Sequence, residues 1–295
     1  MLKVLFVNNF HHPDYLCNAV YIGLSNDKNI ELFTYCVPAH LLKQIGWNDK
    51  ICTNSKHPLG VGYAGYFLSG KVENPPYIET PMQIIDKIYN KYYDKIVFGS
   101  IWRDRQFLWD AENAGYKRED IICLDGEDYQ DPLHLIAEKT LYFKREIYSD
   151  EYKNTHVKPI TFGIPDDLLL EKIPNKERFL ATVIPGNTST YIFTDEKSYF
   201  DDYKKSYFGL TVKKGGWDCL RHYEIIANRC VPYFPNIENC PKKTLVNFPK
   251  ELIRYSNSFV EKNKIPNDYE TINNELFEHA KNNLTCSSLV KQIFL

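Results

Sequence analysis

Short apolar runs alternate with amphipathic stretches along most of this chain. In the first half, strand patterns occupy 3–7, 30–37, 95–100 and 121–124, and helical patterns occupy 15–24, 82–93 and 105–114. Strands separated by helices of about ten to fifteen residues are typical of a parallel sheet with crossover connections. The sequence therefore predicts an α/β fold, with loops and short elements across 40–81.

A second cycle of the same alternation begins near residue 150. Strand patterns lie at 158–162, 179–184, 206–210 and 231–234, and helical patterns at 166–170, 197–205 and 219–228. We expect a first domain over 1–150, a second over 151–270, and closing helices over 271–295 that pack back on the first domain. Ligands of open α/β sheets bind at the carboxyl ends of strands, so a cleft between the two domains is the expected site.

The composition is typical of a soluble globular protein. Hydrophobic residues make up 43% and charged residues 25%, and the net charge is −2, which excludes a uniformly basic nucleic-acid surface. No apolar run is long enough for a membrane span or a signal peptide. The eight cysteines are scattered without a C-x-x-C pair. Reduced thiols and a cytoplasmic location are therefore expected.

The segment KKGGWDCLRHYEIIANRCVPYF, at 213–234, differs most from its surroundings. It opens on a predicted turn of two lysines and two glycines: Lys213, Lys214, Gly215 and Gly216. Asp218 is well placed to cap the helix that follows. The glycines would let backbone amides approach a ligand closely, and a helix N-terminus carries about half a positive charge, which suits a phosphate.

Arg221 and Glu224 lie three residues apart on this predicted helix and so share a face. Arg221 suits bidentate pairing with a diphosphate, and Glu224 suits the two vicinal hydroxyls of a ribose. The spacing thus fits a nucleotide diphosphate. An ordinary capped helix with an Arg/Glu surface pair explains the same spacing equally well.

The run GGWDCLRHYEIIANRCVPYF resembles the nucleotide-sugar-binding signature of GT-B glycosyltransferases, most closely the exostosin-like branch. The residues that fall on the pattern are Arg221, Glu224, Cys230, Val231 and Pro232. The resemblance implies two Rossmann-like domains facing each other across a cleft, with Glu224 on the ribose and Arg221 on the diphosphate. The implied donor is a UDP- or GDP-sugar, with no further cofactor and no metal.

The sequence departs from this family pattern at two places. Cys219 stands where the family often has Ser, and Arg229 stands where it usually has Gly to close the helix. We expect Asn228 to take the left-handed conformation instead. The segments 142–146 (YFKRE) and 159–163 (PITFG) resemble stretches that precede the C-terminal domain in related transferases.

Retaining GT-B enzymes carry a second glutamate eight residues before the ribose-binding one, and Gly216 occupies that position here. Its absence favours an inverting enzyme, which needs a base for the acceptor hydroxyl. The base usually comes from the N-terminal domain, where strand ends offer four candidates: His12, Asp14, Asp125 and Glu127. A solvated acidic turn and a satisfied histidine loop are the structural alternatives.

Two other motifs point elsewhere. The D-x-E at 125–127 is the nearest approach to the acidic pair with which GT-A enzymes hold a metal, but Arg221 and a helix terminus already supply positive charge. The G-x-G-x-x-G at 60–65 does not follow the first strand, so a Rossmann dehydrogenase is excluded by its context.

The chain is therefore predicted to be a hexosyl- or pentosyltransferase that acts on a hydroxyl acceptor, with a glycan favoured. Two alternatives stay open. One is transfer to a modified nucleic-acid base, for which the net charge of −2 gives no support. The other is a non-catalytic nucleotide- or glycan-binding scaffold, because fold alone does not fix function.

Overall fold

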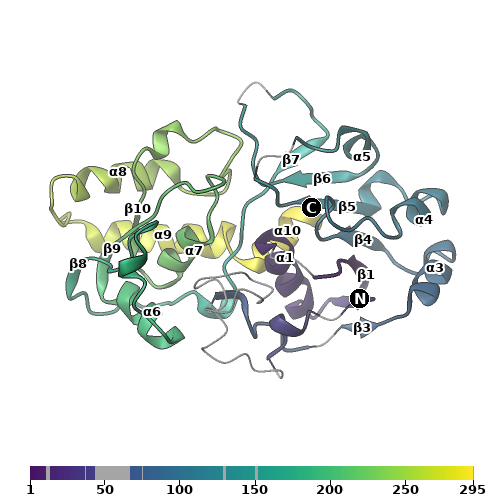
Figure 1. The fold of residues 1–295 in the computed structure, drawn as a ribbon, viewed down its shortest axis with the longest axis horizontal. Coiled ribbons are helices and arrows are strands. Elements are labelled where there is room, and N and C mark those ends of the chain that lie inside the picture. Colours follow the sequence, from purple (N-terminus) through teal and green to yellow (C-terminus); the bar gives the residue numbers. More distant parts are fainter. Residues whose placement is uncertain are drawn as a thin grey trace.

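The computed structural model describes residues 1–10, 14–36, 38–43, 67–74, 76–128, 131–149 and 152–294. Within these ranges the chain forms two parallel sheets, which lie in separate lobes in Figure 1. The larger sheet has the order β3-β2-β1-β4-β5-β6-β7, and the smaller has the order β10-β9-β8. The predicted α/β fold with crossover connections is confirmed.

The larger sheet contains β1 (Leu2–Val7), β2 (Ile30–Thr34), β3 (Tyr77–Ile78), β4 (Lys95–Phe98), β5 (Ile121–Asp125), β6 (Leu141–Lys144) and β7 (Val157–Pro159). The helices among these strands are α1 (Tyr15–Asn26), α3 (Pro81–Tyr89), α4 (Leu108–Asn113) and α5 (His134–Lys139). The patterns in the first half fall on these elements, but α5 and β6 carry no pattern that predicted them. Because β7 pairs with β6, this sheet extends past residue 150.

The smaller lobe contains β8 (Arg178–Leu180), β9 (Ser206–Leu210) and β10 (Val231–Tyr233). Its helices are α6 (Glu196–Lys204), α7 (Leu220–Ala227), α8 (Lys250–Val260) and α9 (Tyr269–Asn283), and α10 (Cys286–Phe294) follows. The predicted closing helices are present as α9 and α10, whereas α8 was not predicted. Among the described helices, none combines the length and the apolar character needed to cross a bilayer.

The side chains of β1 are buried on both faces, as in parallel sheets covered by helices. Val4 and Phe6 join an apolar cluster with α1, whereas Leu5 and Val7 join a second cluster with α3 and α4. The first cluster continues into the smaller lobe, where it includes Tyr223 of α7. The two lobes therefore share an apolar core.

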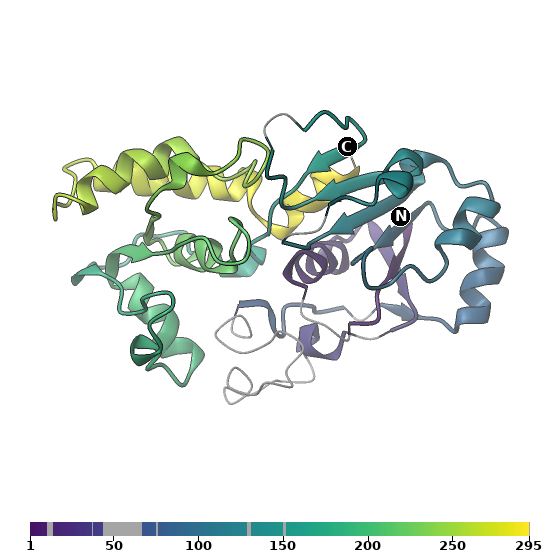
Figure 2. The ribbon, with the colours of Figure 1, turned by 45° about the horizontal axis from the view of Figure 1, so that its top comes forward.

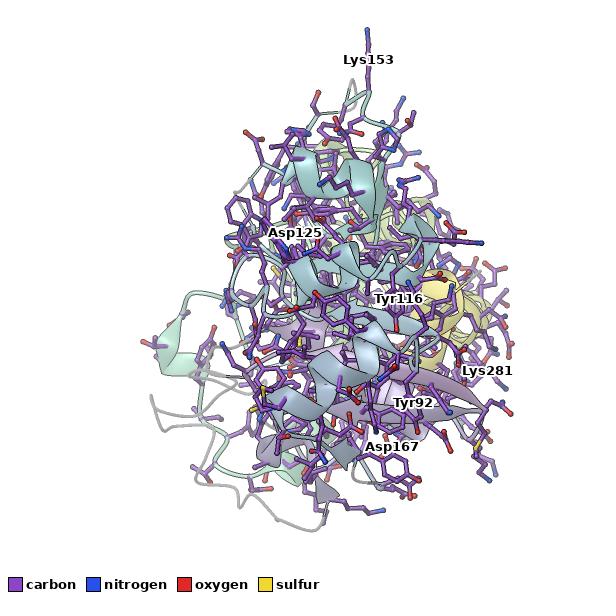
Figure 3. The ribbon with its side chains drawn as sticks, turned by 90° about the vertical axis from the view of Figure 1, so that its right-hand side faces the viewer. Tyr92, Tyr116, Asp125, Lys153, Asp167 and Lys281 are labelled. Carbon is purple, nitrogen blue, oxygen red and sulfur yellow. The ribbon has the colours of Figure 1, made fainter. Side chains whose placement is uncertain are left out.

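Figure 3 views the larger lobe from its outer end, where a lysine ammonium group lies over Tyr92 and another over Tyr116.

The chain crosses between the lobes twice, and the two crossings are hydrogen-bonded. The backbone N–H of Ile164 donates to the carbonyl of Leu284 at 2.7 Å, and that of Cys286 donates to the carbonyl of Ile164 at 2.8 Å. After the second crossing α10 packs beside α1 (Figures 1 and 2). The contact is close, because a Cβ atom at Gly23 would lie 2.8 Å from the carbonyl carbon of Cys286.

Candidate functional site

The turn before α7 is anchored differently from the sequence prediction. Cys219, and not Asp218, is the N-cap residue, and its side chain makes no capping hydrogen bond. The carboxylate of Asp218 instead accepts hydrogen bonds from the backbone N–H of Phe162 at 2.9 Å and from the hydroxyl of Tyr223 at 2.8 Å. Burial raises the pKa of Asp218 to about 7. Asp218 thus ties the turn to the 160–164 crossing.

Gly216 packs so closely against a buried ion pair that a larger side chain would collide with it. A Cβ atom there would lie 2.7 Å from the carboxyl carbon of Glu146 and 2.9 Å from Nη1 of Arg145. These two side chains form a buried salt bridge of 2.7 Å. The sequence prediction assigned this space to a ligand, but at Gly216 the protein itself fills it.

Arg221 and Glu224 come together on one side of α7 among tyrosines. Glu224 is 3% exposed, and its carboxylate accepts a hydrogen bond from the hydroxyl of Tyr199. Burial raises the pKa of Glu224, and Arg221 opposes this shift. The guanidinium of Arg221 lies 5.5 Å from the centre of the Tyr191 ring.

Nη1 of Arg221 is buried and has no hydrogen-bond partner within the described part of the chain. A buried N–H group without an acceptor costs about 1–3 kcal/mol, so such groups normally have a partner. The arrangement is explained if a ligand oxygen supplies the missing acceptor. This atom is the strongest sign of a ligand position at α7.

Lys214 adds positive charge near Arg221, since it lowers the pKa of both Tyr191 and Glu224, and Lys213 precedes it in the same turn. Both side chains are exposed, and the ammonium group of Lys213 lies 5.3 Å from the centre of the Trp217 ring. Burial raises the pKa of Tyr191, but Arg221 and Lys214 more than offset this effect, so its pKa lies below the ordinary value. The carbonyl of Gly215 accepts a hydrogen bond from the hydroxyl of Tyr148 at 3.4 Å. The turn therefore places one lysine, Lys214, near the side of α7 that carries Arg221 and Glu224, and a second, Lys213, over Trp217.

The end of α7 corrects one further expectation. Arg229 has φ 55°, whereas Asn228 has φ −94°. Arg229 therefore takes the left-handed backbone at the position where the family usually has glycine. Its guanidinium donates to the carbonyls of Asn273 at 3.0 Å and Glu171 at 2.7 Å. These hydrogen bonds offset the strain of a non-glycine residue in that conformation.

Asp14 lies at the start of α1, beside the loop that follows β5. Its carboxylate accepts a hydrogen bond from the backbone N–H of Cys17 at 3.0 Å. A Cβ atom at Gly126 would lie 2.7 Å from Oδ1 of Asp14. Burial raises the pKa of Asp14, against the opposing charges of Arg103 and Arg145. Asp14 thus lies against the loop after β5, whereas His12 and the 60–65 motif lie outside the described residues.

Asp125, labelled in Figure 3, is 1% exposed and held by four donors. These are Nζ of Lys144 at 3.0 Å, Nε1 of Trp102 at 3.1 Å, the hydroxyl of Tyr142 at 2.6 Å and the backbone N–H of Glu127 at 3.1 Å. A carboxylate offers about four acceptor positions, so Asp125 is saturated by the protein. Glu127 forms a salt bridge of 2.8 Å with Arg103.

The first turn of α1 also faces α7. Burial and the negative charges of Glu224 and Cys219 raise the pKa of Tyr15 to about 12. The ring centre of Tyr15, the residue after Asp14, lies 5.8 Å from that of Phe162, which in turn lies 6.2 Å from that of Tyr223 on α7. The start of α1, which carries Asp14, therefore lies near α7, which carries Arg221 and Glu224.

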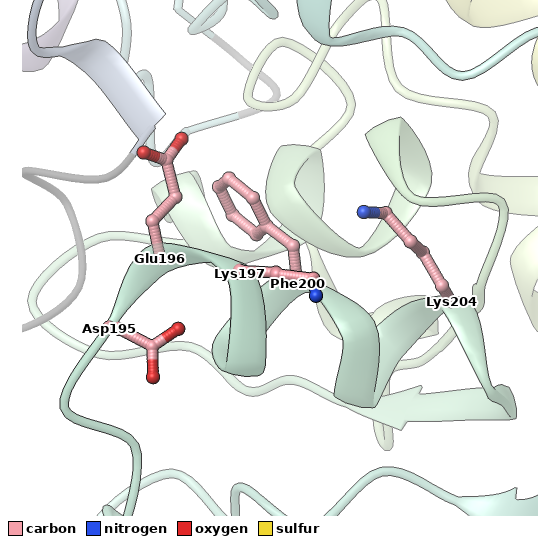
Figure 4. Close-up of a pocket in the computed structure, with 5 residues that line it drawn as sticks. All are labelled: Asp195, Glu196, Lys197, Phe200 and Lys204. Atoms are coloured by element: carbon pink, nitrogen blue, oxygen red, sulfur yellow. The ribbon is translucent and has the colours of Figure 1, made fainter.

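A separate pocket lies on α6. It is lined by Asp195, Glu196, Lys197, Phe200 and Lys204 (Figure 4). None of the predicted site residues that the structure describes lines this pocket, and its two carboxylates are matched by two ammonium groups. We place the candidate site at α7 because the unpartnered Arg221 atom lies there. Within the described ranges, no group of three or more His, Cys, Asp or Glu side chains is arranged to hold a metal ion.

No family model matches this chain, and no curated protein matches it by sequence. Seven chains of solved structures are similar to it. One is an alpha-glucosyltransferase solved in complex with UDP and a 13-mer DNA containing an HMU base. That likeness covers 100% of this chain and 98% of the other, with a TM-score of 0.51 and 10% sequence identity. At this identity the likeness concerns the fold, and the exostosin-like branch stays a prediction. The chain thus has the fold of a GT-B glycosyltransferase, as its sequence predicted.

Proposed function

We propose that this protein is a glycosyltransferase that moves a sugar from a nucleotide-diphosphate sugar to a hydroxyl acceptor. The observation that carries the proposal is the buried Nη1 atom of Arg221, which has no hydrogen-bond partner among the described residues and lies one helical turn from the buried carboxylate of Glu224. A diphosphate oxygen supplies the missing acceptor, and ribose hydroxyls donate to Glu224. The UDP bound to the glucosyltransferase of the same fold supports a UDP-sugar donor ahead of a GDP-sugar.

Lys213, Lys214 and Arg221 stabilise the leaving diphosphate in this proposal. As the bond between the sugar and the diphosphate breaks, negative charge grows on the leaving oxygen. Fixed cations and N–H donors around that oxygen lower the barrier. Gly215 belongs to the same turn. Gly216 and Asp218 do not contact the donor in this proposal but hold the turn against Arg145 and Glu146. Metal independence follows as a prediction, because these groups already supply positive charge.

Asp14 is our proposed base. It removes the proton of the acceptor hydroxyl while that oxygen forms its bond to the sugar. Asp125 is saturated by four donors, and Glu127 is paired with Arg103. Burial raises the pKa of Asp14, which brings a carboxylate closer to the pKa that suits a base near neutral pH. His12 stays a prediction, and so does inversion, which the anomeric coupling constant of the product would test.

Two kinds of molecule could supply the acceptor hydroxyl. A glycan hydroxyl is the acceptor that the sequence favoured. A hydroxyl on a modified DNA base is the second candidate, since the structural neighbour was solved with DNA containing an HMU base and spans this entire chain. Transfer assays with a glycan and with HMU-containing DNA, read by mass spectrometry, separate the two.

A thermal-shift screen against UDP-, GDP-, ADP-, CMP- and dTDP-sugars, with and without magnesium, tests the donor site. One nucleotide class should stabilise the protein, by about 2.7 kcal/mol at a ligand concentration 100 times Kd. The effect should disappear in Glu224→Ala. It should persist in Glu251→Ala, which removes an exposed carboxylate of α8 that forms a salt bridge with Arg254. An unchanged shift in Glu224→Ala, or no shift with any donor, would overturn the donor site.

A further inference from the structure

The segment 142–146 joins the two sides of the candidate site through Arg145. This side chain follows β6 and is 2% exposed. Its Nε and Nη2 atoms donate to the carbonyl of Gly126 at 3.2 and 3.0 Å, and Nη2 also pairs with Asp128. Gly126 is the residue that contacts Asp14. One edge of the guanidinium therefore holds the loop beside the proposed base.

The other edge of the guanidinium holds the turn before α7. Nη1 of Arg145 donates to the carbonyl of Asp218 at 2.7 Å and to the carboxylate of Glu146 at 2.7 Å. The same oxygen of Glu146 accepts the backbone N–H of Asp218 at 2.8 Å. Both backbone polar groups of Asp218 are thus held by the pair, and Gly216 packs directly against it.

The guanidinium is fixed in this position. Its central carbon lies 4.6 Å from the centre of the Phe162 ring, on the first crossing between the lobes. A guanidinium presents its N–H donors in a rigid planar fork, so holding one edge sets the direction of the other. A lysine ammonium group at the same place cannot contact both loops with this geometry.

We propose that Arg145 is a positioning residue for sugar transfer, which sets the distance and angle between the donor turn 213–218 and the acidic loop 125–128. The inference rests on the proposed function. Arg221 and Glu224 belong to α7 itself, and the turn adds the cations that act mainly as the diphosphate leaves, so displacing the turn should slow transfer more than it weakens donor binding. The reaction depends on Arg145 strongly, because a displacement of about 1 Å between reacting groups can slow a reaction about 100-fold.

The test compares Arg145→Lys, Arg145→Met and Gly216→Ala with the unaltered protein. Gly216→Ala acts from the opposite side, because its methyl group pushes the turn away from the pair without changing charge. We expect kcat to fall about tenfold in Arg145→Lys and about 100-fold in the other two, while KM for the donor changes less than about threefold. The matched control is Arg229→Met, which removes another buried arginine, whose guanidinium donates to Glu171, Asn273 and Asn274.

Arg229→Met should lower Tm as much as Arg145→Met and leave kcat, measured well below Tm, within about threefold of wild type. Hydrogen exchange gives a readout that does not need activity. Amides in both 124–128 and 212–218 should exchange at least about tenfold faster in Gly216→Ala and in any folded Arg145 variant, and not in Arg229→Met.

The possible failures are distinguishable. A wild-type protein that binds no donor and transfers no sugar overturns the proposed function, and hydrogen exchange then still tests the coupling of the two loops. If the wild type is active and Gly216→Ala is equally active, the positioning role of Arg145 is wrong but the proposed function stands. Faster exchange in only one of the two loops overturns it as well.

Discussion

The hydroxyl of Tyr199, on α6, donates a hydrogen bond to the buried carboxylate of Glu224, on α7. Burial raises the pKa of Glu224, whereas Arg221 and this hydrogen bond lower it. The ionised carboxylate is the form that accepts hydrogen bonds from ribose hydroxyls. Tyr199 therefore supports donor binding through Glu224.

We predict that Tyr199→Phe weakens UDP binding about tenfold in isothermal titration calorimetry, the effect of losing one hydrogen bond to a charged group. Tyr269→Phe is the matched control. It removes another buried hydroxyl of the same lobe, which donates to the carbonyl of Tyr207 at 2.9 Å. Equal UDP affinity in Tyr199→Phe and wild type would contradict the role of Tyr199.

A second prediction separates the base from an ordinary helix cap. Asp14 and Asp195 are both N-cap residues, whose carboxylates accept the backbone N–H of Cys17 at 3.0 Å and of Ser198 at 2.7 Å. Asparagine caps a helix about as well as aspartate but cannot take up a proton. We expect Asp14→Asn to lower kcat about 100- to 10,000-fold and Asp195→Asn to leave it within about twofold. Near-normal turnover in Asp14→Asn would remove Asp14 as the base.

The pH profile tests Asp14 independently. Burial raises the pKa of its carboxyl above the ordinary value of 3.8. The hydrogen bonds from Cys17 and Ser100 and the charges of Arg103 and Arg145 act in the opposite direction. A base must be ionised, so kcat/KM should fall as the pH decreases, with a midpoint above 3.8. A profile that stays flat down to pH 3.8 in folded protein would exclude this assignment.

The α/β fold was predictable because each strand and helix carries its own periodicity. The elements α8 and β6 were not predicted because of features of their own sequences. In α8 only Ile253, Ser256 and Asn257 are buried, so its apolar stripe is thin. The strand β6 places Lys144 inside the protein, paired with Asp125, and a buried lysine hides the pattern of a buried strand.

The sequence could predict only those parts of the site whose residues are close together in the chain. The shared face of Arg221 and Glu224 follows from helical spacing alone. The roles of Gly216 and Asp218 do not, because their partners lie on the far side of the chain: Asp218 bonds to Phe162, 56 positions away, and to Glu146, 72 positions away. Tyr199 carries no signal among 22 tyrosines, since any of them could be a core residue.

A third prediction concerns stability and pH. His222 is fully buried, with Nδ1 2.8 Å from the hydroxyl of Thr211 and Nε2 2.7 Å from the carbonyl of Trp217. Burial lowers its pKa from 6.5 to about 4. The unfolded chain therefore binds an extra proton between these values, so the stability that His222 contributes is present above pH 6.5 and is lost as the pH falls toward 4.

Asp218 acts in the opposite sense, because its raised pKa favours folding as the pH falls from 7 toward 3.8. The difference between variants isolates His222. In urea denaturation, the unfolding free energy of wild type minus that of His222→Phe should decrease by about 3 kcal/mol as the pH falls from 6.5 to 4. The corresponding difference for Tyr269→Phe should stay constant, since burial raises the pKa of that phenol far above this range. A constant difference for His222→Phe would show that His222 is not buried in its neutral form.

The last prediction asks whether the acidic loop is structural or catalytic at each position. Asp125 and Lys144 form an ion pair whose side chains are 0% and 3% exposed, whereas Glu127 and Arg103 are 24% and 31% exposed. Removing one partner of a buried pair leaves an uncompensated charge, so Asp125→Asn should destabilise the protein by about 3–5 kcal/mol. Glu127→Gln should cost about 1 kcal/mol or less, because water reaches and screens this partly exposed pair. Both variants, assayed where they are folded, should keep kcat within about tenfold of wild type, since the proton goes to Asp14. If Glu127→Gln instead lowered kcat about 1,000-fold with stability intact, the proton would be taken by Glu127, and Asp14 would serve the transfer only as a cap for α1.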